Sequence, residues 1–140
     1  MAPIDRSKTM IYKIVCRDVS ITDLYVGSTT NITMRRSCHR RVCNNPGGKG
    51  YNTYVYDFIR DNGGWDNWEL ILVENYLECT TGEDGRKRER YWCDKLDASL
   101  NTRQPYISPA ELPFIKLEAK RKAREIYQRK RHTYRSKANP

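Results

Sequence analysis

The chain lacks any long apolar run and any apolar leader. None of its uncharged stretches approaches the ~20 residues that a membrane-spanning helix needs. The opening residues 1–8 lack the apolar core of a secretory signal. We also find no internal repeat and no low-complexity tract in the 140 residues. We therefore expect an intracellular protein of one compact domain with a possible appendage, and no membrane partner.

Paired cysteine motifs are also missing. The five cysteines are an odd number, which in an intracellular protein favours free thiols over disulfides. Cys38, His39 and Cys43 suggest zinc at first sight. However, no Cys-x-x-Cys pair is present, and Cys38 and Cys43 do not share one face of a helix. This spacing argues against a zinc site.

Acidic residues are scarce in one part of the chain only. The net charge is +9, and residues 116–140 hold ten Lys and Arg against Glu118 and Glu125. The rest of the chain is nearly balanced, with 16 basic and 15 acidic side chains. A concentrated basic segment is typical of a protein that binds a polyanion. The sequence favours nucleic acid, with a solvated helix face or anionic lipid as alternatives.

The order of elements predicts an α+β fold. Residues 10–16 and 24–28 alternate as strands of a hairpin, in which Gly27 marks a close approach of backbone to another group. Thr30 or Asn31 can cap a helix that runs to about Cys43. A helix over about 52–62 follows the loop 44–50 and stops at Asn62-Gly63-Gly64.

The second half of the chain adds a strand and two helices. Residues 68–73 predict a well-buried strand, and Thr80-Thr81-Gly82-Glu83 fits a capping box for a helix over about 83–97. Tyr91, Trp92 and Leu96 should face the core from that helix. Pro113 suits the first turn of a final basic helix with a thin apolar stripe. We expect a small three-stranded, largely antiparallel sheet flanked by helices (β-β-α-α-β-α), plus this basic C-terminal helix.

Five motifs occur in a fixed order along the chain. Ile11-Tyr12 and Tyr25-Val26-Gly27 lie on the hairpin, and Arg35 follows Gly27 by eight residues. Glu89 lies in Arg88-Glu89-Arg90-Tyr91-Trp92, and Asn101 follows Leu100. This set resembles the GIY-YIG nuclease family, and is most similar to small stand-alone or intron-encoded endonucleases of phages and large DNA viruses. Met10 replaces the first motif's glycine, and the two tyrosines are thirteen positions apart, slightly more than is common in the family.

The resemblance implies a division of the chain and an activity. Residues 9–104 would form the nuclease domain, and 105–140 a hinge and a basic tail that contacts nucleic-acid backbone. The expected activity is hydrolysis of DNA phosphodiester bonds with one Mg²⁺ or Mn²⁺ ion. The expected partner is double-stranded DNA, bound by a monomer or homodimer that needs no small-molecule cofactor. A catalytically silent binding module of the same fold and an RNA-processing nuclease remain alternatives.

The resemblance also implies a role for each motif residue. Glu89 would bind the metal, Arg35 would clamp the phosphate through its planar guanidinium, and His39 would donate to phosphate or relay a proton. Tyr12 and Tyr25 would line the site, one of them as general base, and Asn101 would orient the site. Each has an ordinary structural alternative. Glu89 can be a surface carboxylate among arginines, Arg35 part of a basic helix face, His39 a surface histidine, and the tyrosines core-edge aromatics.

Further basic residues are candidates for contacts with nucleic-acid backbone, which confer affinity more than sequence choice. Three follow Arg35 on the same predicted helix, and the others belong to the tail. They are Arg36, Arg40, Arg41, Lys120, Arg121, Arg124, Arg129, Lys130 and Arg131.

Overall fold

A computed structural model describes residues 3–138 of the chain. Three strands and four longer helices follow one another in the predicted order, with single 3-10 turns at Arg6–Lys8 and Trp65–Asn67. The elements are β1 (Met10–Cys16), β2 (Leu24–Thr29), α1 (Ile32–Asn44), α2 (Tyr54–Asp61), β3 (Trp68–Asn75), α3 (Gly82–Leu96) and α4 (Leu112–Ala138). The predicted α+β class is confirmed.

The sheet has the order β2-β1-β3, and both pairings are antiparallel. In the register, Tyr12 lies opposite Gly27 of β2 and Leu72 of β3. A bulge between Ile11 and Tyr12 shifts the pairing with β3. Because side chains alternate along a strand, Tyr12 and Ile11 point to opposite faces of the sheet.

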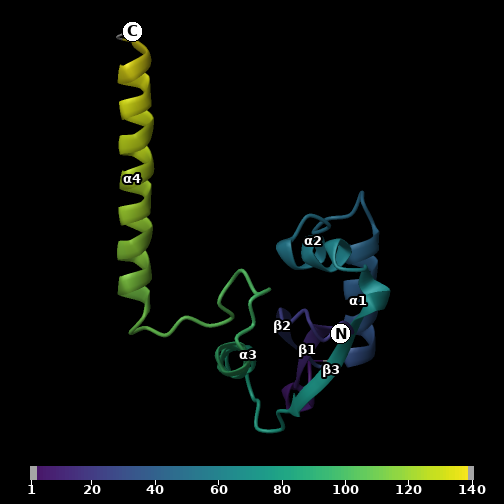
Figure 1. Cartoon of the computed structure of the whole chain (residues 1–140). Helices are drawn as coiled ribbons and strands as arrows, with labels where there is room; N and C mark the ends of the chain where they lie inside the picture. Colours follow the sequence, from purple (N-terminus) through teal and green to yellow (C-terminus); the bar gives the residue numbers. More distant parts are fainter. Residues whose placement is uncertain (1–2, 139–140) are drawn as a thin grey trace. The chain divides into compact units, whose positions relative to one another are not determined.

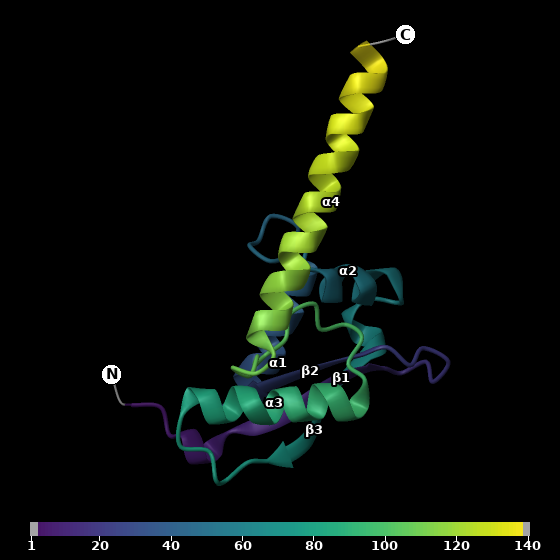
Figure 2. The same ribbon diagram turned by 90° about the vertical axis from the view of Figure 1, so that its left-hand side faces the viewer.

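Helices cover both faces of this sheet, with α3 on one side and α1 on the other (Figure 1, Figure 2). Tyr12 and Ile14 of β1 belong to a core cluster with side chains of α1 and α2. Ile11 and Val26 form a second cluster with Cys93 of α3. The two faces of the hairpin therefore contribute to two separate core clusters. The hairpin itself lies between α3 on one side and α1 on the other (Figure 1, Figure 2).

A capping box begins α3, and an ion pair joins this helix to the sheet. Its Thr81 N-cap accepts from the Asp84 backbone N–H, and the Asp84 side chain accepts from Thr81 in return. This is a capping box, one residue later than the predicted pair of Thr80 and Glu83. Further along the helix, Arg88 forms an ion pair with Glu74 of β3 at 2.7 Å. On α1, Asn31 is the N-cap, as one of the two predicted candidates.

Two predictions about burial are wrong. β3 is only half buried, since Ile71 is 38% and Leu72 is 44% exposed. It lies at the edge of the sheet, where the helices that cover β1 leave part of it open to solvent. Tyr91 does not face the core either, being 42% exposed, whereas Trp92 and Leu96 pack against the second cluster as predicted.

The chain divides into two units, one ending at Tyr106 and the other beginning at Ile107. The second unit contains the long helix α4, along which no described side chain is buried. Pro113 lies in its first turn, where a missing N–H is tolerated. Within residues 3–138, no helix has both the length and the apolar composition required to cross a membrane.

Candidate active site

Tyr12 and Gly27 fit together at the centre of the hairpin. The Tyr12 side chain is fully buried and crosses the backbone of Gly27, the residue opposite it. A Cβ atom at position 27 would overlap the Tyr12 hydroxyl. The close approach predicted at Gly27 is therefore to a tyrosine ring. The glycine leaves room for the hydroxyl end of this ring, which contacts α1.

The Tyr12 hydroxyl meets two side chains of α1. It lies 2.7 Å from Nε2 of His39 and accepts a hydrogen bond from Nε of Arg35 at 3.2 Å. Arg35 and His39 are four residues apart, so both project from one face of the helix. Tyr12 thus joins the sheet to the helix and holds Arg35 by a charge-assisted hydrogen bond.

His39 is not a surface histidine, because only 2% of it is exposed. Its Nδ1 lies 2.8 Å from the Tyr56 hydroxyl of α2, and its ring stacks on Trp65 with centroids 6.1 Å apart. The Tyr25 ring approaches it edge-on at 5.8 Å. Aromatic rings from four segments therefore enclose the imidazole and join Tyr12 to Tyr56 through it.

Burial sets the protonation of this chain of groups. Burial and, to a smaller extent, the nearby Arg35 charge together lower the pKa of His39 to about 4. Burial raises the pKa of Tyr12 above its ordinary value and that of Tyr56 to about 12. At neutral pH both phenols hold their protons and His39 is neutral. One ring nitrogen of His39 then donates to a tyrosine oxygen, and the other accepts from the second tyrosine.

Tyr25 and Glu89 reach the open side of the same site. Both line a groove with Arg35, and the volume of this groove is about 780 Å³. Burial raises the pKa of Tyr25, as does the Glu89 carboxylate, whereas the Arg35 charge opposes them. Tyr25, Arg35 and Glu89 therefore interact electrostatically although they come from β2, α1 and α3.

Glu89 is held by the hairpin. Its Oε2 accepts a hydrogen bond from Ser28 Oγ at 2.8 Å, while its sequence neighbours pair elsewhere, Arg88 with Glu74 and Arg90 with Asp94. Burial raises the pKa of Glu89, and the Ser28 hydrogen bond and the Arg35 charge oppose this. Glu89 is thus partly desolvated and directed to the groove, unlike the solvated surface carboxylate that its sequence context also allowed.

Asn101 acts on the backbone of β2. Its Oδ1 accepts from the Val26 N–H at 2.9 Å, and its Nδ2 donates to the Val26 carbonyl at 2.8 Å. Just before it, the Leu100 N–H donates to the Leu24 carbonyl. Residues 100–101 therefore pair with the outer edge of β2 at Leu24 and Val26. Asn101 fixes the strand from which Tyr25 projects.

The donor set fits one hard divalent cation. Mg²⁺ is commonly held by one or two carboxylates, with water and substrate phosphate oxygens completing its coordination. Glu89 supplies such a carboxylate, since one oxygen is bound by Ser28 and the groove is open to it. Among the described residues, no group of three His, Cys, Asp or Glu could hold a metal by protein ligands alone.

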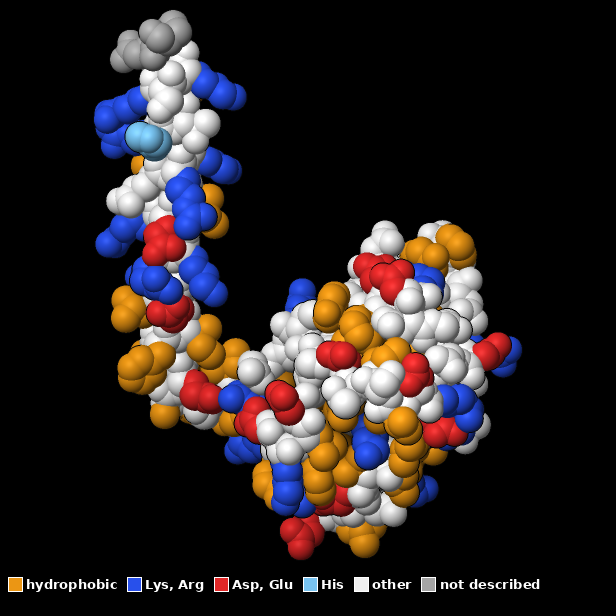
Figure 3. Space-filling model, in the orientation of Figure 1, with side chains coloured by type: hydrophobic (Ala, Val, Ile, Leu, Met, Phe, Trp, Pro, Cys, Tyr) orange, Lys and Arg blue, Asp and Glu red, His pale blue; other side chains and the backbone are white. Residues whose placement is uncertain are grey.

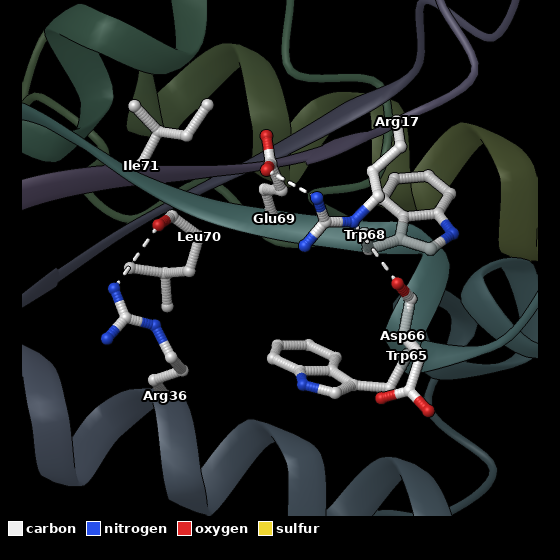
Figure 4. A pocket seen from close by; sticks show the side chains of 8 residues that line it. All are labelled: Arg17, Arg36, Trp65, Asp66, Trp68, Glu69, Leu70 and Ile71. Carbon is white, nitrogen blue, oxygen red and sulfur yellow. Dashed lines mark hydrogen bonds and ion pairs between the residues drawn. The ribbon is translucent and has the colours of Figure 1, made fainter.

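Of the basic candidates on α1, Arg36, Arg40 and Arg41 are not among the residues that line this groove. Arg36 donates to the Leu70 carbonyl at the edge of β3 and lines a separate pocket of about 390 Å³ with Trp65 and Trp68 (Figure 4). Arg40 and Arg41 are exposed on α1. The six candidates of the tail lie on α4, whose Lys and Arg side chains project along its length (Figure 3).

Two residues of the site were missed from the sequence. Tyr56 belongs to a helix with regular apolar spacing, so nothing distinguished it from a core aromatic. Ser28 directly follows the Tyr25-Val26-Gly27 motif. Its proximity to α3 depends on packing across the sheet and leaves no local signal.

Comparison with known proteins gives one result. A family model described as the GIY-YIG catalytic domain matches residues 8–104, more than half of the chain. No curated protein and no solved structure gave a match at the significance that we required.

Proposed function

Because the chain belongs to the GIY-YIG nuclease family, we propose that it is a divalent-metal-dependent DNA endonuclease with Tyr25, Arg35 and Glu89 at its reaction centre. One observation carries the proposal. A phenol, a guanidinium and a partly desolvated carboxylate from three different elements line one groove. Hydrolysis of a phosphodiester needs a group for the water, a cation for the phosphate and a site for a metal.

Arg35 has the geometry of a phosphate clamp. Its Nε donates to the Tyr12 hydroxyl, and its side chain lines the groove. A guanidinium presents planar donors that match phosphate oxygens, and its charge offsets the negative charge that develops at phosphorus. Tyr12 and His39 act as positioning residues here, since both are buried behind Arg35.

Tyr25 is our candidate for the group that orients and deprotonates the attacking water. It lines the groove, whereas Tyr12 is fully buried. Its pKa is raised by burial, so ionisation near neutral pH requires added positive charge, to which Arg35 contributes. A phenolate at Tyr25 would accept a proton from water as that oxygen attacks phosphorus.

Glu89 would hold the metal, with Ser28 fixing the orientation of its carboxylate. A divalent ion held there would supply positive charge for the phosphate and the leaving oxygen. The basic side chains of α4 would add phosphate contacts that raise affinity for duplex DNA without reading its sequence.

The test is cleavage of supercoiled plasmid in Mg²⁺, Mn²⁺ or EDTA at low salt. Glu89→Gln keeps the size of the side chain and removes its charge, so it should abolish metal-dependent nicking. Glu83→Gln on the same helix is the control, because Glu83 is exposed and outside the groove. It should cleave like wild type. If wild-type protein cuts nothing under any condition, the proposed endonuclease activity is refuted. If all three proteins cleave in EDTA, the proposed requirement for a metal is refuted.

A further inference from the structure

The groove extends beyond Tyr25, Arg35 and Glu89 into a region that the proposed chemistry does not use. One wall is the loop between α1 and α2 with the start of α2, which contributes Lys49, Thr53 and Tyr54. The other wall is the segment after α3, which contributes Arg103 and Gln104. A chain that passes the reaction centre would continue between these walls.

Tyr54 presents an aromatic ring in this extension. It is the first residue of α2 and is 49% exposed. Phe58, one turn later, supports the ring at 6.2 Å between centroids, and Phe58 in turn packs edge-on against Trp68 at 5.9 Å. The Tyr54 ring is therefore anchored to the core while about half of it stays open to a ligand.

The extension is also suited to an anionic chain. Lys49, Arg103 and Gln104 form no hydrogen bond or ion pair with any part of the protein between residues 3 and 138. Arg60, by contrast, already donates hydrogen bonds to two backbone carbonyls and to Asp57. Of the described groove residues, Glu89 alone carries a carboxylate. Unpaired cations beside an open ring are the two elements of a site for single-stranded nucleic acid.

The backbone of the first wall is defined by Gly50. Its φ of +89° lies in a region that L side chains rarely adopt, and a Cβ there would approach Val42 of α1 to 3.3 Å. The turn thus brings the loop against α1 beside the catalytic groove. Lys49 occupies the position just before this turn, on the groove side.

From these features we propose that the extension binds unpaired nucleotides next to the scissile phosphate, with one base stacked on Tyr54. This inference rests on the proposed nuclease function and names its substrate class. Bases within a continuous duplex cover each other's faces, so an aromatic side chain can stack only on a base that is unpaired or extruded. The whole groove, reaction centre included, has a volume of about 780 Å³, which suits about one or two nucleotides of a single strand. The substrate is DNA with an unpaired strand beside the cut, such as a flap or bubble.

Cleavage of matched oligonucleotides tests the substrate class. One sequence is prepared as a continuous duplex, as a flapped duplex and as a bubble, and single-turnover rates are measured with Mn²⁺. Wild type should cut the flap or bubble faster than the duplex. Tyr54→Ala should lower the single-turnover rate at subsaturating enzyme on the unpaired substrates by about 5- to 150-fold, since stacking on one base contributes that much. Its rate on continuous duplex should stay within about twofold.

Two further variants separate stacking from other effects of the substitution. Tyr54→Phe keeps the ring and should retain wild-type preference. Tyr91→Ala removes a similarly exposed tyrosine that lies outside the groove, and should also behave as wild type. Faster cutting of continuous duplex by wild type, or equal losses on all three substrates in Tyr54→Ala, would overturn the proposal.

A binding experiment distinguishes this proposal from the nuclease itself. In the Glu89→Gln background, affinity for the flapped DNA is measured with a single abasic site placed at each position around the junction. An abasic site at one of these positions should weaken binding by the protein that keeps Tyr54 and should not affect binding by Tyr54→Ala. This comparison is a double-mutant cycle between the base and the ring. Absence of such a position overturns the stacking site even if cleavage is found. If such a position is found but wild-type protein cleaves no DNA, the binding site stands and the nuclease proposal is refuted.

Discussion

At the residue scale, the site separates side chains that reach the groove from side chains that hold them. Tyr25, Arg35 and Glu89 line the groove, whereas Tyr12 and His39 are buried behind it. The Tyr12 hydroxyl is already occupied by Arg35 and His39, at 3.2 and 2.7 Å. Two tyrosines that look equivalent in the sequence therefore have different roles in our proposal.

Replacing each tyrosine by phenylalanine should separate these roles. Tyr25→Phe is expected to lower the cleavage rate by about 10²–10⁴-fold, as for loss of a general base, with little change in stability. Tyr12→Phe leaves a buried His39 nitrogen without its partner and should lower the free energy of unfolding by about 1–3 kcal/mol. Single-turnover rates and urea unfolding measure both. The opposite pattern would assign the base to Tyr12.

His39 predicts a dependence of stability on pH. Its pKa of about 4 in the folded protein lies below the ordinary value near 6.5, so the unfolded chain binds a proton first as the pH falls. The contribution is complete above pH 6.5 and is lost as the pH falls toward 4. Between pH 6.5 and 5 the unfolding free energy should drop by up to about 2 kcal/mol more in wild type than in His39→Gln.

The control for this measurement is His132→Gln, which removes an exposed histidine of α4. It should keep the wild-type dependence on pH. Equal slopes for wild type and His39→Gln in urea unfolding at several pH values would show that His39 is not held neutral by burial.

Site residues with a fixed position in a motif could be predicted from the sequence. Residues that reach the site only through packing of distant segments could not. Arg35 was found because it follows Gly27 by eight residues, and its neighbour Arg36 was indistinguishable by type. In the structure the two leave α1 in different directions, since Arg36 faces the edge of β3. Tyr56 and Ser28 could not be predicted, because their contacts with His39 and Glu89 join distant parts of the chain.

At the scale of elements, the edge of β2 determines where Tyr25 lies. That edge is covered by Leu100 and Asn101 in place of a further strand. The pairing satisfies the Val26 N–H and carbonyl, which would otherwise be open. A segment without regular secondary structure therefore fixes one wall of the site.

Asn101→Ala tests this role. The substitution leaves both Val26 backbone groups without their partner, and should lower the free energy of unfolding by about 1–3 kcal/mol. Cleavage should fall with it, because Tyr25 precedes Val26. Asn52→Ala serves as the control, since Asn52 is exposed in a loop. Urea unfolding and plasmid nicking measure the two effects; an Asn101→Ala protein as stable as wild type would contradict the pairing.

The sequence predicted the order of elements better than their burial. Alternation, caps and glycine stops identified β1, β2, α1 and α2 to within about two residues. For β3 the apolar run Leu70-Ile71-Leu72-Val73 predicted a well-buried strand. A run of this kind does not say whether the strand is central, and β3 is at the edge. Its exposure depends on sheet order, which no local pattern encodes.

At the scale of the whole molecule, charge is divided between the two units. Residues 116–140 carry most of the net +9. On α4, Arg121 forms ion pairs with Glu118 and Glu125, both at 3.0 Å and all exposed. Ion pairs of this kind are weak in water, so a phosphate can replace either glutamate as the partner of Arg121.

Neutralising α4 should change the dependence of DNA binding on salt. With its six candidate Lys and Arg residues replaced by glutamine, the plot of log affinity against log salt should flatten by about 0.9 for each phosphate that α4 no longer neutralises. Glu118→Gln together with Glu125→Gln is the matched control and should strengthen binding. Fluorescence anisotropy over a salt series measures the slopes. An unchanged slope in the six-residue variant would show that α4 does not anchor DNA.

The fit between Gly27 and Tyr12 also limits how this sequence can diverge. The glycine is required by the ring that crosses it, because a Cβ there would meet the Tyr12 hydroxyl. Position 27 can therefore accept a side chain only after position 12 has become smaller. In a library randomised at both positions and selected only for folding, larger residues at 27 should appear together with smaller ones at 12. Proteins with such pairs would keep the sheet but lose the Tyr12 hydroxyl, which contacts Arg35 and His39. Substitution first at position 12 and then at position 27 would therefore convert the proposed nuclease into a folded protein without activity.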